Sequence, residues 1–336
     1  MKRVRWGVIG AGGIAHRRTL PVFLQVANST LVSVMDVEGA EELGKRYGVG
    51  STDRIEAVLA RDEVDAVYIA TPVQFHAEQV IAAARARKHV LCEKPLARNL
   101  SEARTMVDAC IRAGVLLQDA YMLRHHRAHG EVLRLLREGA IGKPFYAHAE
   151  WSFSYEPIEG AWRQIPELGG GGALMDVGSH MVDIVEMFLG RIARVACRIG
   201  TFVHSYPVED VGTVLLEFES GVHGTLVASF AASGDIMPTR LHLYGSTGAI
   251  HAHGTMGQGS GGEVAIYRER DGRGSQETVP YQEVNTYARQ VESMARRMLA
   301  GERLDARSAE GMLCTVAVLD ACYESARTGR FVEIRV

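Results

Sequence analysis

The fold of the first part of this chain is decided by the stretch Val4-Arg5-Trp6-Gly7-Val8-Ile9-Gly10-Ala11-Gly12-Gly13-Ile14-Ala15. The apolar run from Trp6 to Ile9 predicts a buried strand, and helix character begins at Ile14. Gly10 permits a tight turn between them, and Gly12 lets a pyrophosphate approach the backbone. The first N–H groups of the following helix have no intrahelical partner and carry a partial positive charge. The stretch therefore predicts an anion site of the dinucleotide-binding type.

Asp36 follows the next apolar run, from Thr30 to Met35. A carboxylate at the end of a second strand can accept hydrogen bonds from the ribose hydroxyls of adenosine, and it repels a 2′-phosphate. The alternative is a loop aspartate at the start of the next helix. The glycine turn upstream favours a dinucleotide, NAD in preference to NADP, and Gly13 and Ile14 are expected to contact it.

Length and composition are those of a globular enzyme. The chain has 336 residues, more than one hydrophobic core usually supports, which predicts two domains. Its net charge is −3 with no long run of one sign, so neither nucleic-acid nor membrane binding is indicated. The five cysteines form no C-x-x-C pair, which favours reduced thiols and a cytoplasmic location over a disulfide framework.

Strand and helix signals alternate over the first 120 residues, which predicts an α/β domain with a parallel sheet covered by helices. Strands are expected at 4–9, 30–36, 66–70, 89–92 and 115–119, and helices at 14–26, 38–47, 54–60, 76–86 and 101–113. Further on, β-rich runs follow one another closely, which favours a large, mostly antiparallel open sheet. They lie at 145–155, 193–204, 212–218, 223–230, 240–244, 248–251 and 263–268, with helices at about 127–138, 172–189, 284–300 and 308–328. We therefore expect a dinucleotide-binding α/β domain over 1–122 and an α+β domain over 123–336.

Two further strand ends carry polar side chains toward the expected cofactor. Thr71 and Pro72 follow one strand and His76 opens the next helix, so all three could line the nicotinamide side. His76 is equally consistent with an ordinary helix N-terminal residue. Glu93 and Lys94 follow the next strand and are also expected near the cofactor. A lysine at a strand end is normally a solvated charge, but here Lys94 could stabilise a developing alkoxide on a substrate.

Asp176 and His180 are four residues apart and share one face of an expected helix. The preceding glycines, 169–172, are expected to let the backbone approach a ligand closely. The pair could ligate a metal, but a third ligand at suitable spacing is not evident. The alternative is a proton-transfer histidine that a carboxylate orients, or with which it shares the substrate. The apolar neighbours of the pair speak against a purely solvated helix face.

Three histidines near the start of another expected helix also invite a metal interpretation. His125, His126 and His129 include a pair at i and i+4 spacing, which can chelate a cation. No cysteine or paired carboxylate lies nearby, so a solvated or pocket-rim helix start is favoured. The sequence therefore predicts no metal site.

Taken together, these motifs resemble the Gfo/Idh/MocA family of nicotinamide-dependent oxidoreductases over essentially the whole chain. The resemblance rests on Gly10-x-Gly12-x-x-Ala15, Ala70-Thr71-Pro72 with His76, Glu93-Lys94-Pro95 and Gly-Gly-Gly-x-x-x-Asp176-x-x-x-His180. It implies that Lys94 is the catalytic lysine, His180 the acid/base and Asp176 a substrate-orienting carboxylate. It also implies that Trp162 and Arg163 approach the cofactor and substrate.

The resemblance implies hydride transfer between NAD and a hydroxyl- or carbonyl-bearing carbon of a sugar, sugar derivative or inositol. Two alternatives stay open: an NAD-dependent glycoside hydrolase, and a non-catalytic regulator that senses NAD or a sugar. The presence of Lys94 and His180 speaks against the regulator. The resemblance further implies that residues 1–122 form a Rossmann domain and that residues 123–336 bind the substrate. It also implies a homodimer or homotetramer assembled through the sheet of the second domain.

Overall fold

The computed structural model describes residues 2–270 and 273–336. The chain divides into two compact units, one formed by Met1–Ala120 with Tyr287–Leu313 and the other by Tyr121–Thr286 with Cys314–Val336. The sequence places the boundary after residue 122, close to the division after Ala120. It assigns Tyr287–Leu313 to the second domain, whereas the structure groups this segment with the first unit.

Within the described residues, the first unit is built on a six-stranded parallel sheet in the order β3-β2-β1-β4-β5-β6. Its strands are β1 (Val4–Ile9), β2 (Ser29–Met35), β3 (Gly50–Thr52), β4 (Ala66–Ile69), β5 (His89–Cys92) and β6 (Leu117–Asp119). All four residues of β4 are buried, as expected for a parallel strand covered on both faces. Sequence reasoning missed β3, because its Gly-Ser-Thr sequence gives no apolar run.

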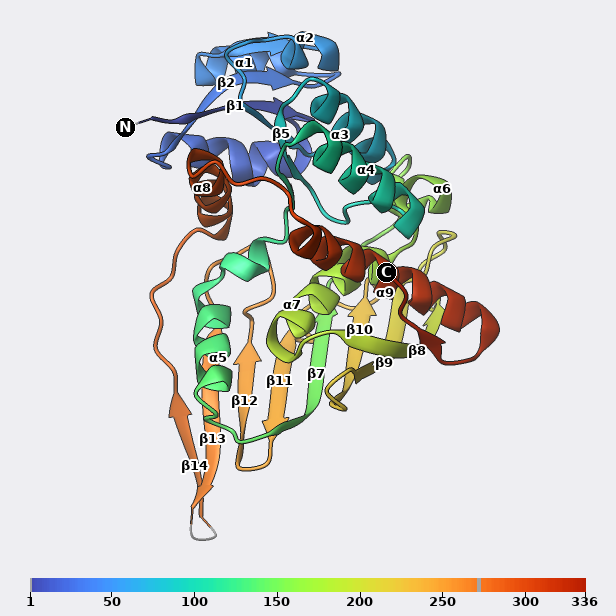
Figure 1. Ribbon diagram of the computed structural model, residues 1–336. Helices are drawn as coiled ribbons and strands as arrows, with labels where there is room; N and C mark the ends of the chain where they lie inside the picture. The colour runs from blue at the N-terminus through green and yellow to red at the C-terminus, as the bar shows by residue number, and fades with distance from the viewer. Residues whose placement is uncertain (1, 271–272) are drawn as a thin grey trace. The chain divides into compact units, whose positions relative to one another are not determined.

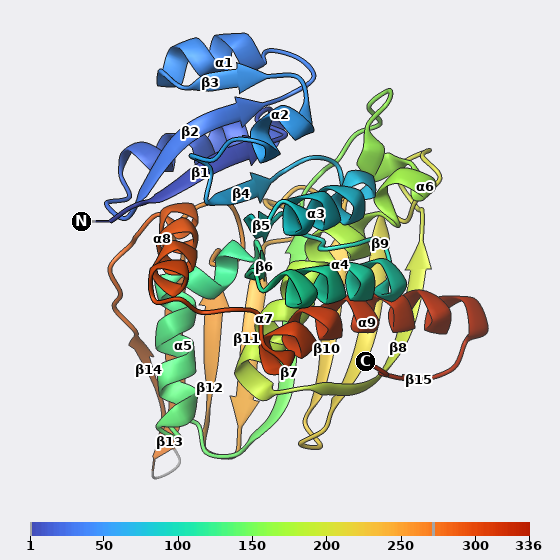
Figure 2. The ribbon, with the colours of Figure 1, turned by 45° about the horizontal axis from the view of Figure 1, so that its top comes forward.

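Helical segments connect these strands, and α3 and α4 run side by side (Figures 1 and 2). They are η1 (Ala15–Thr19), η2 (Leu20–Leu24), α1 (Ala40–Tyr47), α2 (Ile55–Leu59), η3 (Val73–Phe75), α3 (His76–Arg85) and α4 (Leu100–Ala113). Helix α8 (Thr286–Leu299), which follows the second sheet in the chain, belongs to this unit from Tyr287 onward. The sequence predicts one regular helix over 14–26, but the chain forms a π-helical turn, η1, followed by a 3-10 helix, η2. Pro21 explains the change, since it lacks the N–H that a continuous helix requires.

The second unit is built on an open sheet whose nine described strands lie in the order β14-β13-β12-β11-β7-β10-β9-β8-β15. They are β7 (Pro144–Ser152), β8 (Ile192–Gly200), β9 (Val211–Phe218), β10 (His223–Ser229), β11 (Arg240–Gly245), β12 (Gly248–His253), β13 (Glu263–Arg270), β14 (Arg273–Thr278) and β15 (Val332–Glu333). Only the β7–β10 pair is parallel among those described. The mostly antiparallel sheet expected from the sequence is thus confirmed, although β14 and β15 were not foreseen, because they carry no apolar alternation.

Helices α5 and α7 lie along one face of this sheet (Figures 1 and 2). The helical segments are η4 (Met122–His125), α5 (Arg127–Arg137), η5 (Trp162–Gln164), α6 (Pro166–Gly169), η6 (Leu174–Gly178), α7 (Ser179–Leu189) and α9 (Ala306–Thr328), the last of which crosses the boundary between the units. Strand β11 shows how the two faces differ: Leu241 and Leu243 are buried, whereas His242 and Tyr244 on the opposite face are half-exposed. This alternation gives the sheet one apolar and one polar face.

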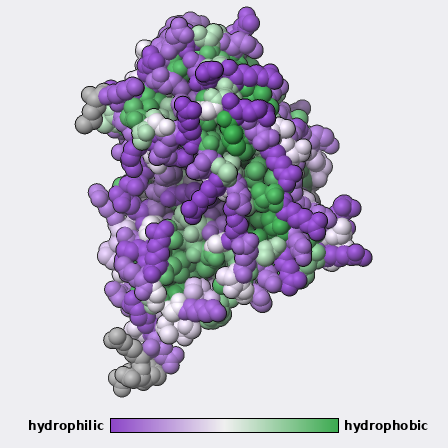
Figure 3. Space-filling view, in the orientation of Figure 1, coloured by the Kyte–Doolittle hydropathy of each residue, from purple (hydrophilic) through white to green (hydrophobic). Residues whose placement is uncertain are grey.

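Hydrophilic residues dominate the surface seen in Figure 3, and the apolar residues that show there gather in a few patches. In the part of the chain that the structure describes, no helix combines the length and apolar character needed to cross a bilayer.

Candidate active site

The first unit brings several of the expected cofactor residues to one edge of its sheet. The strand order reverses between β1 and β4, and ligands of doubly wound sheets bind beyond the carboxyl ends of the strands at such a point. Gly10 follows β1 with φ +80°, and a Cβ there would lie 2.7 Å from the backbone nitrogen of Thr71, which follows β4. Glycine is therefore required at position 10, because any side chain would collide with the neighbouring turn.

Asp36, which directly follows β2, forms a hydrogen bond with the same glycine-rich turn. Its Oδ2 accepts a 2.7 Å hydrogen bond from the backbone N–H of Gly12, and its Oδ1 accepts one of 3.3 Å from the backbone N–H of Glu38. A Cβ at Gly13 would meet no atom within 4 Å, so the backbone there is open to a ligand. Ile14 is half-exposed and directly precedes the helical segment η1. The arrangement fits a pyrophosphate at the turn and a ribose beside the carboxylate.

His76 begins α3, and both of its ring nitrogens face backbone carbonyl groups of turns at this edge. Nε2 is 2.9 Å from the carbonyl oxygen of Thr71, and Nδ1 is 3.1 Å from that of Pro95 and 3.2 Å from that of Leu96. The residue is 1% exposed, and burial lowers its pKa. His76 therefore joins the turn at Thr71 and Pro72 to the turn that carries Lys94. This geometry gives it a positioning role, and its nitrogens are not directed toward an open space.

The carboxylate of Glu93 is also held from within the protein. The hydroxyl group of Tyr68 donates a 2.5 Å hydrogen bond to Oε1, and the backbone N–H of Lys94 donates one of 3.2 Å to Oε2. Burial and the nearby carboxylate raise the pKa of Tyr68 well above its ordinary value, so the phenol remains a donor. Glu93 is buried while Lys94 is half-exposed. Glu93 thus fixes the backbone from which the lysine side chain extends.

In the second unit, Asp176 lies in η6 and His180 in the first turn of α7. The His180 ring is 2% exposed and contacts two aromatic rings, Trp151 at a centroid distance of 5.1 Å and Tyr121 at 5.5 Å. These contacts restrict the orientation of the imidazole. A histidine that is held in this way can exchange a proton in a defined direction.

The expected Trp162-Arg163 pair lies beside Asp176. Nε of Arg163 is 3.5 Å from Oδ1 of Asp176, and the Arg163 guanidinium carbon is 4.2 Å from the centroid of the Trp162 ring. The structure therefore gathers a carboxylate, a guanidinium and an indole at the beginning of the helix that carries His180. These groups offer both acceptors and donors to a polyhydroxylated ligand.

Two glycines of the run before Asp176 lie against other parts of the second unit. A Cβ at Gly171 would overlap the hydroxyl group of Tyr323, and one at Gly172 would overlap the backbone oxygen of Glu209. Glu209 Oε1 accepts hydrogen bonds of 2.9 Å from the N–H groups of Gly172 and Leu174, and one of 2.8 Å from Tyr323. Gly171 and Gly172 therefore admit Tyr323 and the backbone of Glu209, whose carboxylate anchors the start of η6. The expectation that these glycines also admit a ligand stays a prediction.

The sequence interpretation also missed Asp183, which lies three residues after His180. Its side chain is 1% exposed and forms an ion pair with Arg124, whose Nη2 is 2.7 Å and Nε 2.8 Å from Oδ1. Burial raises the pKa of the nearby Glu186 to about 7. The sequence does carry a signal for Asp183, because a carboxylate three residues after His180 on an otherwise apolar helix is unusual.

The expectation of a solvated or pocket-rim helix start is wrong for two of the three histidines near α5. His126 is 2% exposed and its Nδ1 accepts a hydrogen bond from the N–H of Ala128, which caps the helix. His129 is fully buried, with Nδ1 3.0 Å from the carbonyl oxygen of Leu123 and Nε2 3.0 Å from Oγ1 of Thr255. His129 is thus held through both ring nitrogens, and His126 caps the helix through Nδ1.

Comparison with known proteins agrees with this geometry. The family model described as "Oxidoreductase family, NAD-binding Rossmann fold" matches residues 4–121, and the "GFO/IDH/MocA C-terminal domain" matches residues 129–251. These two matches together cover more than half of the chain.

Relatives match over nearly the full length. The chain is 30% identical to the 1,5-anhydro-D-fructose reductase of Ensifer adhaerens, with 98% of each chain covered. It is 31% identical to the D-xylose 1-dehydrogenase (NADP(+)) 2 of Haloferax volcanii, covering 98% of this chain and 99% of the relative. Among solved structures, the aldose-aldose oxidoreductase from Caulobacter crescentus, complexed with glycerol, is similar with a TM-score of 0.88 and 25% identity, covering 99% of this chain and 100% of that one.

Proposed function

The chain belongs to the GFO/IDH/MocA family of oxidoreductases, and from this premise we propose that it transfers a hydride between NAD and a hydroxyl- or carbonyl-bearing carbon of a sugar, sugar derivative or inositol. The observation that carries the proposal is the edge of the first sheet, where the Gly10 turn, Asp36 and the Lys94 turn follow the parallel strands β1, β2 and β5. The names of the matched relatives, which are sugar reductases and dehydrogenases, support the substrate class. Neither the hydrolase nor the regulator has comparable support.

The residues at this edge fit a dinucleotide. The open backbone of the turn at Gly13 would bind the pyrophosphate, and Asp36 would accept hydrogen bonds from the adenosine ribose. Each Asp36 oxygen already accepts one backbone hydrogen bond and retains a lone pair for a further donor. When bound, the nicotinamide supplies the carbon that gives or takes the hydride.

Lys94 is proposed to stabilise negative charge on the substrate oxygen. Its backbone is held by Glu93 on one side, and His76 holds the following residues on the other. A half-exposed ammonium on a fixed backbone can donate a hydrogen bond to an alkoxide as the hydride leaves the adjacent carbon.

His180 is proposed to move the proton. In the oxidative direction the imidazole accepts the hydroxyl proton while the C–H bond releases its hydride, which leaves a carbonyl group. In the reductive direction the imidazolium returns that proton to the oxygen. Asp176 and Arg163 would bind neighbouring hydroxyl groups and so orient the reacting carbon.

The decisive experiment is a panel of polyols, aldoses, ketoses and inositols, assayed with NAD and NADP separately. We expect turnover with at least one class, with one NADH formed for each carbonyl group produced. Net cleavage of a glycoside with no change in NADH absorbance would instead identify a hydrolase, and binding without turnover across the panel would identify a regulator.

We further propose a cytoplasmic location and a homodimer or homotetramer. The five cysteines are buried free thiols, which suits a reducing compartment. On the polar face of the second sheet, Leu215 is 49% exposed although it lies within a strand, β9. Light scattering should give a mass of two or four chains, and Leu215→Arg should reduce it.

A further inference from the structure

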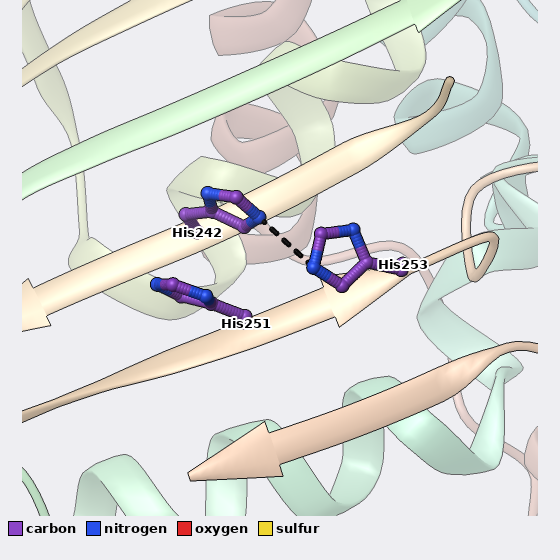
Figure 4. Close-up of side chains that lie close together, drawn as sticks. All are labelled: His242, His251 and His253. Atoms are coloured by element: carbon purple, nitrogen blue, oxygen red, sulfur yellow. Dashed lines mark hydrogen bonds between the residues drawn. The ribbon is translucent and has the colours of Figure 1, made fainter. Parts of the chain in front are cut away.

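Three histidines from two neighbouring strands of the second unit lie together in Figure 4. His242 on β11 is the direct cross-strand partner of His251 on β12, and their rings stack with a centroid distance of 3.9 Å. His253 lies two residues beyond His251 and therefore projects from the same face. Its Nε2 is 3.3 Å from Nε2 of His242. One ring nitrogen from each of the three lies within 4.8 Å of the others.

We propose that this histidine triad, His242, His251 and His253, binds one divalent transition-metal ion of the kind that prefers imidazole ligands, such as zinc. Zinc binds histidine nitrogen at about 2.0–2.1 Å with tetrahedral geometry, which places two ligand nitrogens roughly 3.3 Å apart. The His242 and His253 nitrogens have this separation. Rotation of the half-exposed His251 ring would complete a site of three imidazoles with a fourth position open to water.

The hydrogen bonding around the triad supports this assignment. Within residues 2–270 and 273–336, the buried Nε2 of His251 has no hydrogen-bond partner, so a bound ion would satisfy it. The hydroxyl group of Tyr244 lies 3.4 Å from Nδ1 of His242. Such an outer partner fixes the orientation of a ligating imidazole and leaves its other nitrogen for the metal.

The charges nearby are compatible with a cation. Arg240 is the cross-strand partner of His253, and its positive charge opposes a metal ion. It forms an ion pair with Glu150, whose Oε2 lies 3.2 Å from Nη1 of Arg240 and 3.4 Å from Nε2 of His148. Glu150 therefore offsets the arginine charge close to the site.

Sequence reasoning did not find this site, because two of its ligands lie on one strand and the third on another. None of the three histidines belongs to the residues proposed for hydride transfer. We therefore expect the metal site to be independent of the oxidoreductase chemistry and to stabilise the β11–β12 pair.

The test uses the full chain without an affinity tag, stripped of metal by a chelator and then dialysed. Calorimetric titration with Zn²⁺ should show one ion per chain, and Co²⁺ should give the visible absorption bands of a tetrahedral site. His242→Ala and the exposed His253→Ala should each weaken Zn²⁺ binding at least about tenfold, since even loss of an outer-shell partner can cost that much. His223→Ala, an exposed histidine on β10 of the same sheet, is the matched control and should bind like the parent.

Thermal melting distinguishes a variant that has lost a metal-binding side chain from one that no longer folds. Zn²⁺ should raise the Tm of the parent and of His223→Ala but not that of His253→Ala, whose metal-free Tm should equal the metal-free Tm of the parent. The proposal is overturned if the parent binds no Zn²⁺, or if the triad variants bind it as tightly as the control variant does.

Discussion

The carboxylate of Asp36 accepts a 2.7 Å hydrogen bond from the backbone N–H of Gly12. This contact ties the end of β2 to the glycine-rich turn after β1. A Cβ at Gly12 would lie 3.2 Å from the same carboxylate oxygen, so a side chain there would make the carboxylate shift by a few tenths of an ångström. A fixed negative charge therefore stands beside the turn that is proposed to hold the pyrophosphate.

We expect this charge to make the protein prefer NAD to NADP. Repulsion between Asp36 and a 2′-phosphate at close range is worth on the order of 1–3 kcal/mol, which corresponds to about ten- to hundredfold in Kd. Asp36→Asn keeps an oxygen for the Gly12 N–H group but removes the charge. It should therefore reduce the ratio of the Kd for NADP to the Kd for NAD about tenfold or more. Glu38→Gln, an exposed acid in the same turn, is the control. Fluorescence titration with both dinucleotides measures the ratio, and a lower Kd of the parent for NADP would contradict the assignment.

Lys94 should contribute to the chemical step and not to folding. Charge on the substrate oxygen develops only as the hydride leaves, so removing the ammonium should lower kcat and not merely raise KM. We expect Lys94→Ala to reduce kcat about 10²- to 10⁴-fold. Its Tm and its NAD Kd should match those of the parent. The exposed Lys143→Ala is the control. A near-normal kcat for Lys94→Ala would show that Lys94 is a surface charge.

Asp176 and His180 should act on the substrate and not through a metal. The Arg163 guanidinium lies 3.5 Å from the Asp176 carboxylate and disfavours a cation there. Treatment with EDTA should therefore leave the dehydrogenase rate unchanged, even where it removes an ion from the histidine triad on β11 and β12. Steady-state rates before and after dialysis against the chelator test this. Complete loss of activity, restored by one divalent ion, would refute it.

His129 should make the protein less stable as the pH falls. Burial and the neighbouring His126 lower the pKa of His129 from 6.5 to about 3. Below pH 6.5 the unfolded chain binds a proton at this residue and the folded protein does not, so the free energy of unfolding decreases. The contribution of His129 reaches about 1.4 kcal/mol per pH unit between these two values.

His129→Gln should reduce the pH dependence caused by this group. Because the substitution also changes packing, the quantity to compare is the slope of unfolding free energy against pH from denaturant titrations between pH 7 and 5. We expect a shallower slope in the variant than in the parent. Identical slopes would mean that His129 binds protons equally in the folded and unfolded states, which would contradict the lowered pKa.

The sequence alone predicted the parallel sheet of the first unit and the edge of that sheet at which we propose that the dinucleotide binds. A buried strand, a glycine turn and an acidic residue after a strand are local features. Each can be recognised from a few consecutive residues, such as those around Gly10 and Asp36. The alternation of strands and helices then fixes a parallel sheet, because parallel strands require long connections. The likeness of Lys94 and His180 to family motifs led to roles that remain predictions.

Only the tertiary structure decided what several of the singled-out residues contact. Gly171 and Gly172 accommodate Tyr323 and Glu209, and Tyr323 comes from the last helix of the chain. The burial of His129, and the meeting of His242 with His251 and His253, likewise depend on which elements pack together and on strand register. Sequence spacing describes neighbours along one helix or strand. Contacts between distant segments are set by the packing of the whole core, in which the position of each residue depends on many others.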